Sequence, residues 1–132
     1  MLLHKRGGWI RSNVTRQTYR IVRGVSCQTN NVVYVLTCDL PGCKKQYVGQ
    51  SKRQMGTRLK EHLADIKHKR DTPVAIHFNL PKHKASHLTP TILEVIKRDP
   101  KEESTTLFRL ERERFWIYQL RTMTPQGINV QG

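Results

Sequence analysis

Two short apolar runs, separated by a turn and followed at once by an amphipathic segment, constrain the fold of this chain most strongly. Val32 to Thr37 form the first run and Gln46 to Gly49 the second, and their β-branched and aromatic residues are typical of β-strands. Ser51 to Gln54 then match the S-x-x-Q capping box that begins many helices. The sequence therefore predicts two strands that lead directly into a helix.

The predicted helix carries two kinds of side chain on neighbouring faces. Apolar residues recur at helical spacing and predict a stripe that faces a sheet: Met55, Leu59, Leu63 and Ile66. Arg58 and His62 are four residues apart, so they lie one above the other, and we expect their face to point towards the strand ends. By spacing alone, such a pair most often marks an ordinary solvated helix face.

The rest of the chain predicts three further elements. Pro73 suits the first turn of a second helix that ends before Pro81. Thr91 to Ile96 predict a third strand. Ser104 or Thr105 would cap a long helix that continues to about Arg121.

Apolar residues occur around much of the long helix, which predicts that it is largely buried. Glu111 and Glu113 both fall among these apolar neighbours. A buried carboxylate must be paired, protonated or bound to a metal ion, because burying it free costs several kcal/mol. Periodicity does not choose between the two glutamates.

Charge indicates a polyanionic partner. The 132 residues carry a formal net charge of +14, and cations that neutralise phosphates release counterions from nucleic acid. Residues 1–30 contain no acidic side chain, and we interpret them as a basic, loosely ordered arm or linker in which Thr18 to Val25 could form one strand.

No apolar run approaches the length of a membrane span, so we expect no membrane partner. Three cysteines without a secretory signal favour an intracellular protein.

Two cysteines and two histidines have spacings that fit a tetrahedral zinc site. Four residues separate Cys38 from Cys43, and five separate His77 from His83. His87 is an alternative to His83. Cys27 is more simply a buried structural thiol, although it could replace one of the histidines.

The first two runs resemble the GIY-YIG endonuclease family, with Val32-Val33-Tyr34 in place of GIY and Tyr47-Val48-Gly49 as YIG. The resemblance covers about Asn31 to Val130. It implies an α/β fold with a small, mainly antiparallel three-stranded sheet flanked by helices, here with an inserted zinc site. It also implies that residues 31–132 form the nuclease domain.

The same resemblance assigns roles to individual residues. Arg58 matches the phosphate-binding arginine beyond YIG, and His62 is a further catalytic candidate. Tyr34 matches the proposed general base, and Tyr47 would help to order the attacking water. Of the two glutamates, Glu113 in Glu113-x-x-Trp116 matches the ligand of the catalytic Mg²⁺ or Mn²⁺, whereas Glu111 would pair with an arginine. Asn129 matches the asparagine near the end of the domain, which would fix the geometry of tyrosine or substrate.

The cysteine and histidine pairs, together with residues 74–79, are similar to GIY-YIG domains attached to Penelope-like retroelement reverse transcriptases. That similarity implies a nuclear DNA endonuclease that nicks target DNA to prime reverse transcription, with the reverse transcriptase in the same polypeptide. Alternatives are a structure-specific repair endonuclease and a non-catalytic, zinc-stabilised nucleic-acid-binding module. Basic side chains on and around the first helix are expected to contact DNA: Lys52, Arg53, Lys67, Lys69 and Arg70.

Overall fold

Three antiparallel strands form the centre of the structure, a computed structural model that describes residues 8–131. Their order is β4-β3-β5, so the strand formed by the first apolar run lies between the other two. The elements are, in chain order, β1 (Trp9–Arg11), β2 (Thr18–Arg20), β3 (Val32–Cys38), β4 (Gln46–Ser51), α1 (Met55–Lys67), α2 (Pro73–Phe78), the short 3-10 helix η1 (Ala85–His87), β5 (Leu88–Val95) and α3 (Glu102–Leu120). The predicted α/β fold with a three-stranded sheet is confirmed.

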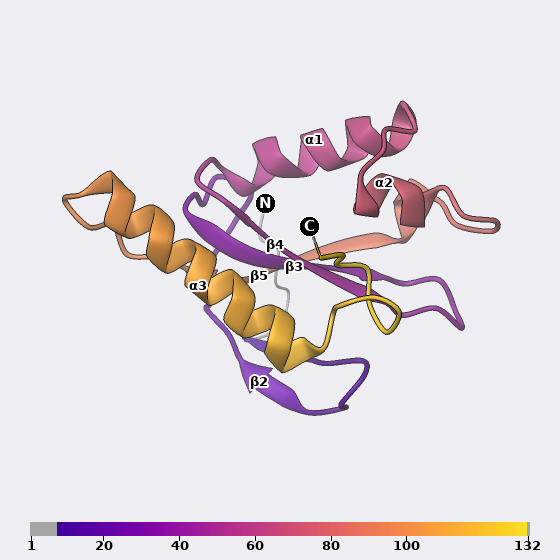
Figure 1. The fold of residues 1–132 in the computed structure, drawn as a ribbon, viewed down its shortest axis with the longest axis horizontal. Helices are drawn as coiled ribbons and strands as arrows, with labels where there is room; N and C mark the ends of the chain where they lie inside the picture. Colours follow the sequence, from indigo (N-terminus) through magenta and orange to yellow (C-terminus); the bar gives the residue numbers. More distant parts are fainter. Residues whose placement is uncertain (1–7, 132) are drawn as a thin grey trace.

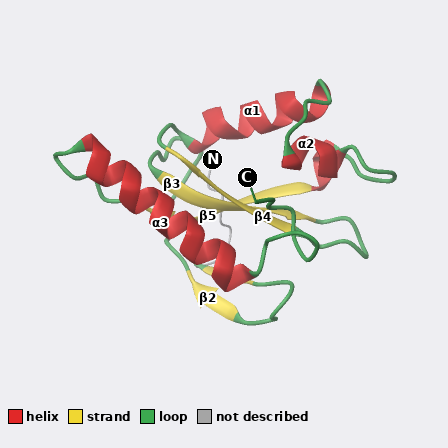
Figure 2. Cartoon of the chain, in the orientation of Figure 1, coloured by secondary structure: helices red, strands yellow, loops and turns green. Residues whose placement is uncertain are grey.

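Alternation along β3 divides the core between the two faces of the sheet. Tyr34 and Leu36 pack on one face with residues of α1 and α2, whereas Val33 and Val35 pack on the other with Trp116 of α3. Figure 1 shows the resulting layers, with α1 and α2 above the sheet and α3 and the N-terminal hairpin below it. Figure 2 shows the same arrangement by secondary structure. Because helices cover both faces, β3 is apolar almost throughout.

The predicted capping box at the start of α1 is wrong. Ser51 is the last residue of β4, where it pairs with Val32, and the helix begins only at Met55. The first helical amides are satisfied by backbone instead, because Met55 N–H donates to the carbonyl of Thr29 at 2.9 Å and Gly56 N–H donates to that of Cys27 at 2.7 Å. Strand pairing thus replaces the local cap.

The buried face of α1 differs by one position from the predicted stripe. Met55, Leu59 and Ile66 face the sheet as expected, but Leu63 is 39% exposed and His62 is only 3% exposed. His62 occupies the buried position because it lies beside Tyr34 of β3, with which it forms a hydrogen bond. The functional pair Arg58 and His62 therefore lies at the edge of the sheet-facing stripe.

The predicted first residue is confirmed for α2 and wrong for α3. Thr72 caps α2 through its side chain, which accepts the amide of Ala75, and Pro73 is the first helical residue, as predicted. Helix α3 begins at Glu102 rather than after Ser104 or Thr105, and Thr105 is buried within its first turns. Nor is α3 largely buried: it is an outer layer, so Leu107 and Tyr118 face solvent while Trp116 and Leu120 meet the sheet.

The expected loose arm is also wrong for residues 8–30. Strands β1 and β2 form an antiparallel hairpin, and Ser12 Oγ donates to the carbonyl of Leu120 at 2.8 Å. Ile21 and Val25 are buried, each in one of the two cores. Apolar burial and the backbone bonds to α1 therefore hold this basic segment against the domain.

None of the helices within residues 8–131 has the length and apolar character that a membrane span requires.

Candidate functional site

Tyr34 and Gly49 lie opposite each other on β3 and β4. Tyr34 is fully buried, and a Cβ atom at Gly49 would lie 2.5 Å from its hydroxyl oxygen. Any larger residue at Gly49 would displace the tyrosine, because a real Cβ atom essentially never approaches a heavy atom so closely. The glycine of the Tyr47-Val48-Gly49 motif therefore makes room for the phenol.

His62 connects the two tyrosines. Its Nε2 atom is 2.6 Å from the hydroxyl oxygen of Tyr34, and both phenol rings meet the imidazole edge-on, with centroids 5.8 Å away for Tyr34 and 5.9 Å for Tyr47. Burial, with help from the charge of Arg58, lowers the pKa of His62 to about 4. The imidazole is therefore neutral at physiological pH, and its role is to hold Tyr34 by a hydrogen bond rather than by charge.

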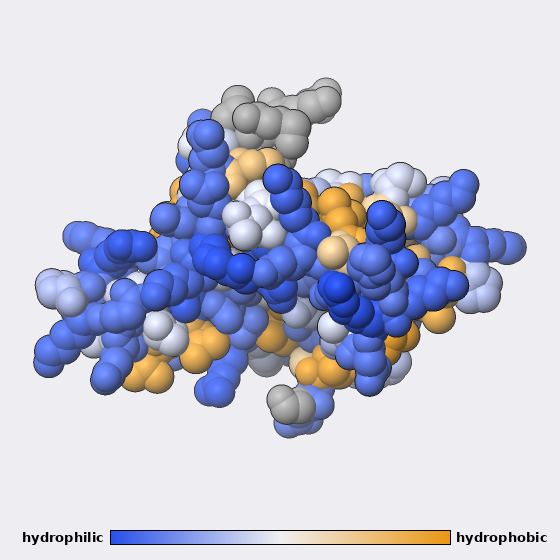
Figure 3. Space-filling model, turned by 90° about the horizontal axis from the view of Figure 1, so that it is seen from above, coloured by the Kyte–Doolittle hydropathy of each residue, from blue (hydrophilic) through white to orange (hydrophobic). Residues whose placement is uncertain are grey.

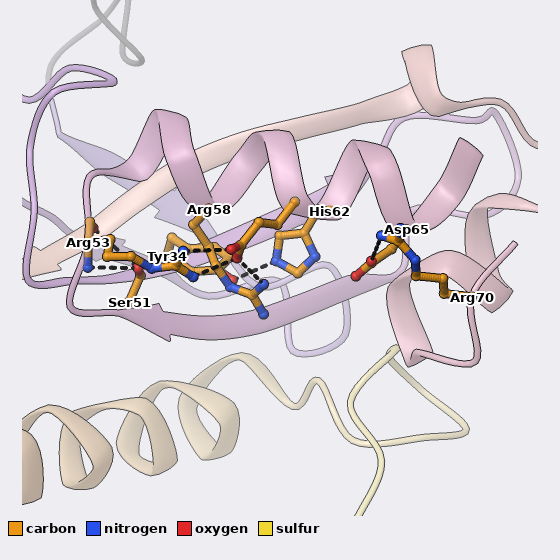
Figure 4. A network of polar contacts seen from close by, with 8 residues as sticks. Tyr34, Ser51, Arg53, Arg58, His62, Asp65 and Arg70 are labelled. Carbon is orange, nitrogen blue, oxygen red and sulfur yellow. Dashed lines mark hydrogen bonds and ion pairs between the residues drawn. The ribbon is translucent and has the colours of Figure 1, made fainter. Parts of the chain in front are cut away.

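Arg58 brings a positive charge to this cluster. Figure 4 shows Arg58 and His62 extending from α1 towards Tyr34. Burial raises the pKa of Tyr34 well above its ordinary value, and Arg58 is the main group that opposes this rise. The Arg58 side chain is still 27% exposed, so its guanidinium can also meet a ligand from solvent.

Glu113 faces the same cluster from α3. Burial raises the pKa of its carboxyl, while Arg114, Arg109 and Arg58 lower it, and the charge of Glu113 in turn raises the pKa of Tyr34. Within residues 8–131 the carboxylate has no hydrogen bond or ion pair. It lines a cavity of about 760 Å³ at the C-terminal end of α3. A half-buried carboxylate that lacks a protein partner and borders a cavity fits a hard divalent cation such as Mg²⁺.

Glu111 differs from Glu113 in its surroundings. Its side chain points away from the core and is exposed. The predicted ion pair with an arginine is not formed within the part of the chain that the structure describes. The arginine beside it, Arg112, instead binds Glu94 of β5, with Nε 2.9 Å and 3.0 Å from the two carboxylate oxygens. The two glutamates thus leave α3 in different directions, and the carboxylate near Tyr34 and Arg58 is that of Glu113.

Asn129 holds the edge of the sheet. Its Nδ2 donates to the carbonyl of Val48 at 2.9 Å, and its Oδ1 accepts the Val48 amide at 2.8 Å and the Thr122 hydroxyl at 2.7 Å. Asn129 is buried, and these bonds occupy both ends of its amide. The side chain therefore fixes β4, between Tyr47 and Gly49, rather than reaching for substrate.

We expect Asn129→Ala to lower the free energy of unfolding by about 1–3 kcal/mol, because it leaves the buried polar groups of Val48 and Thr122 without partners. Denaturant titration measures this loss. Asn129→Asp keeps the shape and the acceptor but buries a carboxylate against the Val48 carbonyl, so its loss should be at least as large. Equal stability of Asn129→Ala and the unmodified chain would contradict a clamping role.

The four predicted zinc ligands come together. The ligand atoms of Cys38, Cys43, His77 and His83 all lie within 4.8 Å of one another. Nδ1 of His83 hydrogen-bonds with the carbonyl of Pro81 at 3.0 Å, so it carries the proton, and its buried Nε2 has no partner in residues 8–131. The unprotonated Nε2 of His83 therefore points a free lone pair at the other three ligand atoms. Two thiols and two imidazoles arranged in this way fit a tetrahedral metal ion.

Neither alternative ligand belongs to this cluster. His87 lies in η1, where its Nδ1 accepts the amide of Lys84 at 3.1 Å. Cys27 lies beside the start of α1, where its carbonyl accepts the amide of Gly56. The four candidate ligands thus join the end of β3 and the turn after it to α2 and the loop that follows α2.

The predicted DNA-binding residues surround α1, and three of the five form ion pairs. Lys52 pairs with Glu102 at 3.1 Å, and Arg70 pairs with Asp65 at 2.8 Å. Arg53 pairs with Glu61, whereas Lys67 and Lys69 are exposed without ion pairs in residues 8–131. Figure 3, a view from above onto the α1 side, shows hydrophilic side chains over most of this face.

Two polar residues of the site were missed by the sequence reasoning. Arg109 is only 5% exposed, and its Nε and Nη1 donate to Gln50 at 2.6 Å and Asn31 at 2.7 Å. Glu61 binds both Arg53 and Arg58. Glu61 could have been found, because it lies three residues after Arg58 on the predicted helix. Nothing local indicates the partners of Arg109, which come from distant segments.

Comparison with known proteins identifies the family. The family model described as the GIY-YIG catalytic domain matches residues 30–129. The chain therefore belongs to the GIY-YIG catalytic domain family, and the predicted enzyme class, a GIY-YIG-type endonuclease, is confirmed.

Solved structures show the same fold. The catalytic domain of the homing endonuclease I-TevI is 22% identical, with a TM-score of 0.55, over 76% of this chain and 98% of that chain. A mutant of the catalytic domain of the intron endonuclease I-TevI is 23% identical, with a TM-score of 0.53, over 74% and 89% of the two chains. No curated protein matches the chain.

Proposed function

We propose that this domain hydrolyses one phosphodiester bond in a strand of DNA, using Mg²⁺ or Mn²⁺ held by Glu113. The observation that carries the proposal is the contact of His62 of α1 with Tyr34 of β3 at 2.6 Å and with the ring of Tyr47 of β4, beside Arg58. Glu113 of α3 is near enough for its charge to raise the pKa of Tyr34. A binding module needs basic residues but has no need for a buried phenol, a buried neutral imidazole and a carboxylate without a hydrogen-bond or ion-pair partner among residues 8–131. The proposed roles of these residues follow from their surroundings.

Arg58 binds the non-bridging oxygens of the scissile phosphate, since a guanidinium donates paired hydrogen bonds to such an oxyanion. Tyr34 and Tyr47 order the attacking water, and His62 fixes the Tyr34 hydroxyl in place. Burial keeps the proton on Tyr34 at neutral pH in the free domain, and Arg58 favours the ionised form that could accept a proton from the water. Glu113 would hold the divalent cation, which when bound would supply positive charge for the leaving oxygen.

We further propose that the clustered cysteines and histidines bind structural Zn²⁺, because four protein ligands leave no open position for water or substrate. The resemblance to Penelope-like elements supports a specific biological role for the nick. In that role the exposed 3′ end primes a reverse transcriptase carried in the same polypeptide, and the protein acts in the nucleus.

A plasmid nicking assay tests the activity. Supercoiled DNA should become open circles with Mg²⁺ and stay supercoiled with a chelator added before it. Binding without cleavage under every divalent cation would favour a non-catalytic module. Comparison of linear duplex with branched DNA tests the role, because a strong preference for branched substrates would favour a repair endonuclease over a target-nicking one.

DNA affinity should fall steeply as salt rises, with a log–log slope of several units, because each neutralised phosphate contributes about −0.9 to that slope. Lys67→Gln combined with Lys69→Gln should reduce the steepness by about 1–2 units if both contact phosphates. Fluorescence anisotropy with a labelled duplex, repeated at several salt concentrations, measures the slope for the unmodified domain and for the double variant. A slope that stays near zero would count against a DNA substrate.

A further inference from the structure

Glu61 binds two arginines at the entrance of the site. Nη1 and Nη2 of Arg53 lie 2.6 Å and 2.7 Å from its two carboxylate oxygens, and Nη1 of Arg58 lies 3.0 Å from one of them. Figure 4 shows Arg53 and Arg58 on the same side of α1 as Tyr34 and His62. The carboxylate therefore occupies guanidinium donors of the arginine that is expected to bind substrate.

A carboxylate and a phosphodiester present similar groups to a guanidinium. Each offers two anionic oxygens, and paired N–H donors bind either in the same geometry. Arg53 binds Glu61 through both of its terminal nitrogens, and Arg58 adds a third donor. The position of the Glu61 oxygens thus marks a place where two phosphate oxygens would find three donors.

Glu61 is able to leave this position. Its side chain is 38% exposed and that of Arg53 is 56% exposed, so water can replace the contacts that are lost. The other polar residues near the site are held more firmly, as Arg109 is buried against Gln50 and Asn31. Glu61 is the acidic side chain that Arg58 contacts within residues 8–131, and moving it away leaves two positive charges facing solvent.

We propose that Arg53 and Arg58 form a two-arginine phosphate clamp, that Glu61 occupies this clamp in the free domain, and that a phosphate of the DNA backbone replaces the Glu61 carboxylate on binding. The clamp rests on the proposed function and adds a second phosphate-binding residue, Arg53, to it. Glu61 then acts as a competitor that weakens binding and suppresses occupation of the clamp by weaker anions. It takes no part in the chemical step.

Glu61→Gln tests the proposal against a matched control, Asp65→Asn. Both acids lie on α1, each pairs with an arginine, and each substitution changes the net charge by the same amount. General attraction to DNA therefore rises equally in both, and each substitution frees an arginine: Arg53 and Arg58 of the clamp in Glu61→Gln, and Arg70 outside the clamp in Asp65→Asn. Affinity for a labelled duplex, measured without divalent metal, should improve about threefold more in Glu61→Gln than in Asp65→Asn. Thermal melting confirms that both variants are folded.

Steady-state nicking gives a second readout. Glu61→Gln should lower KM and leave kcat unchanged, and adding Arg53→Gln should remove the gain in affinity. Equal affinities of Glu61→Gln and Asp65→Asn would overturn the proposal, as would loss of kcat in Glu61→Gln, which would place Glu61 in the chemistry. Because affinity is measured without metal, the clamp can be rejected or supported even if the nicking activity itself is not found.

Discussion

Glu113→Gln should reduce the rate of nicking by on the order of 10³-fold, which is the size of effect seen when a group that supports transition-state charge is removed. The amide keeps the shape of the side chain but loses the negative charge that a divalent cation requires. DNA affinity should change little, since basic residues around α1 supply most of it. Single-turnover nicking at saturating enzyme measures the chemical step separately from binding.

Glu111→Gln is the matched control for this variant. It makes the same change two residues away on α3, at an exposed carboxylate, so it should nick at the normal rate. Normal nicking by Glu113→Gln together with loss of activity in Glu111→Gln would move the metal ligand to Glu111. Normal nicking by both variants would reject a cation held by either glutamate.

Cys43→Ser should lower the melting temperature by roughly 10 °C or more, because a structural metal ion contributes its binding free energy to folding. The four ligands join segments that are far apart in the sequence, in a domain whose cores are small. Activity should disappear together with the fold. Glu113→Gln, by contrast, should melt like the unmodified chain, since the amide keeps the size of the side chain and the carboxylate it replaces forms no hydrogen bond or ion pair within residues 8–131.

Cys27→Ser separates the loss of a ligand from the loss of any thiol. Cys27 lies outside the cluster, so its removal should leave both the zinc content and the melting temperature nearly unchanged. Elemental analysis of protein purified without added metal measures the ion directly. Less than about half a zinc per chain would contradict the site, given the affinity of such ligand sets.

Local patterns were sufficient for the elements that depend on nearby residues. The apolar runs at Val32 and Gln46 predicted β3 and β4, and Pro73 predicted the start of α2. The cysteine and histidine spacings predicted a cluster that the structure brings within ligand distance. In each case the determining interaction is encoded within a few residues, or the chemistry of the side chains has few alternatives.

Tertiary contacts decided the rest, because they compete with local signals and often outweigh them. Ser51 could cap a helix, but pairing with Val32 extends β4 through it and leaves the carbonyls of Thr29 and Cys27 to satisfy the first helical amides. Leu63 is more apolar than His62, yet the imidazole is buried because Tyr34 offers it a hydrogen bond.

By itself the sequence predicted the three strands of the central sheet, the cysteine and histidine pairs and the positive charge, and its resemblance to the family supplied the candidate catalytic residues. Only the tertiary structure decided which glutamate faces the site, that Asn129 clamps β4, and that Glu61 occupies the donors of Arg58. The physical reason is that the direction of a side chain and its distance from other groups depend on tertiary packing. Residue type and spacing specify what a side chain can do, whereas its partner depends on how α1, α3 and the C-terminal segment pack around the sheet.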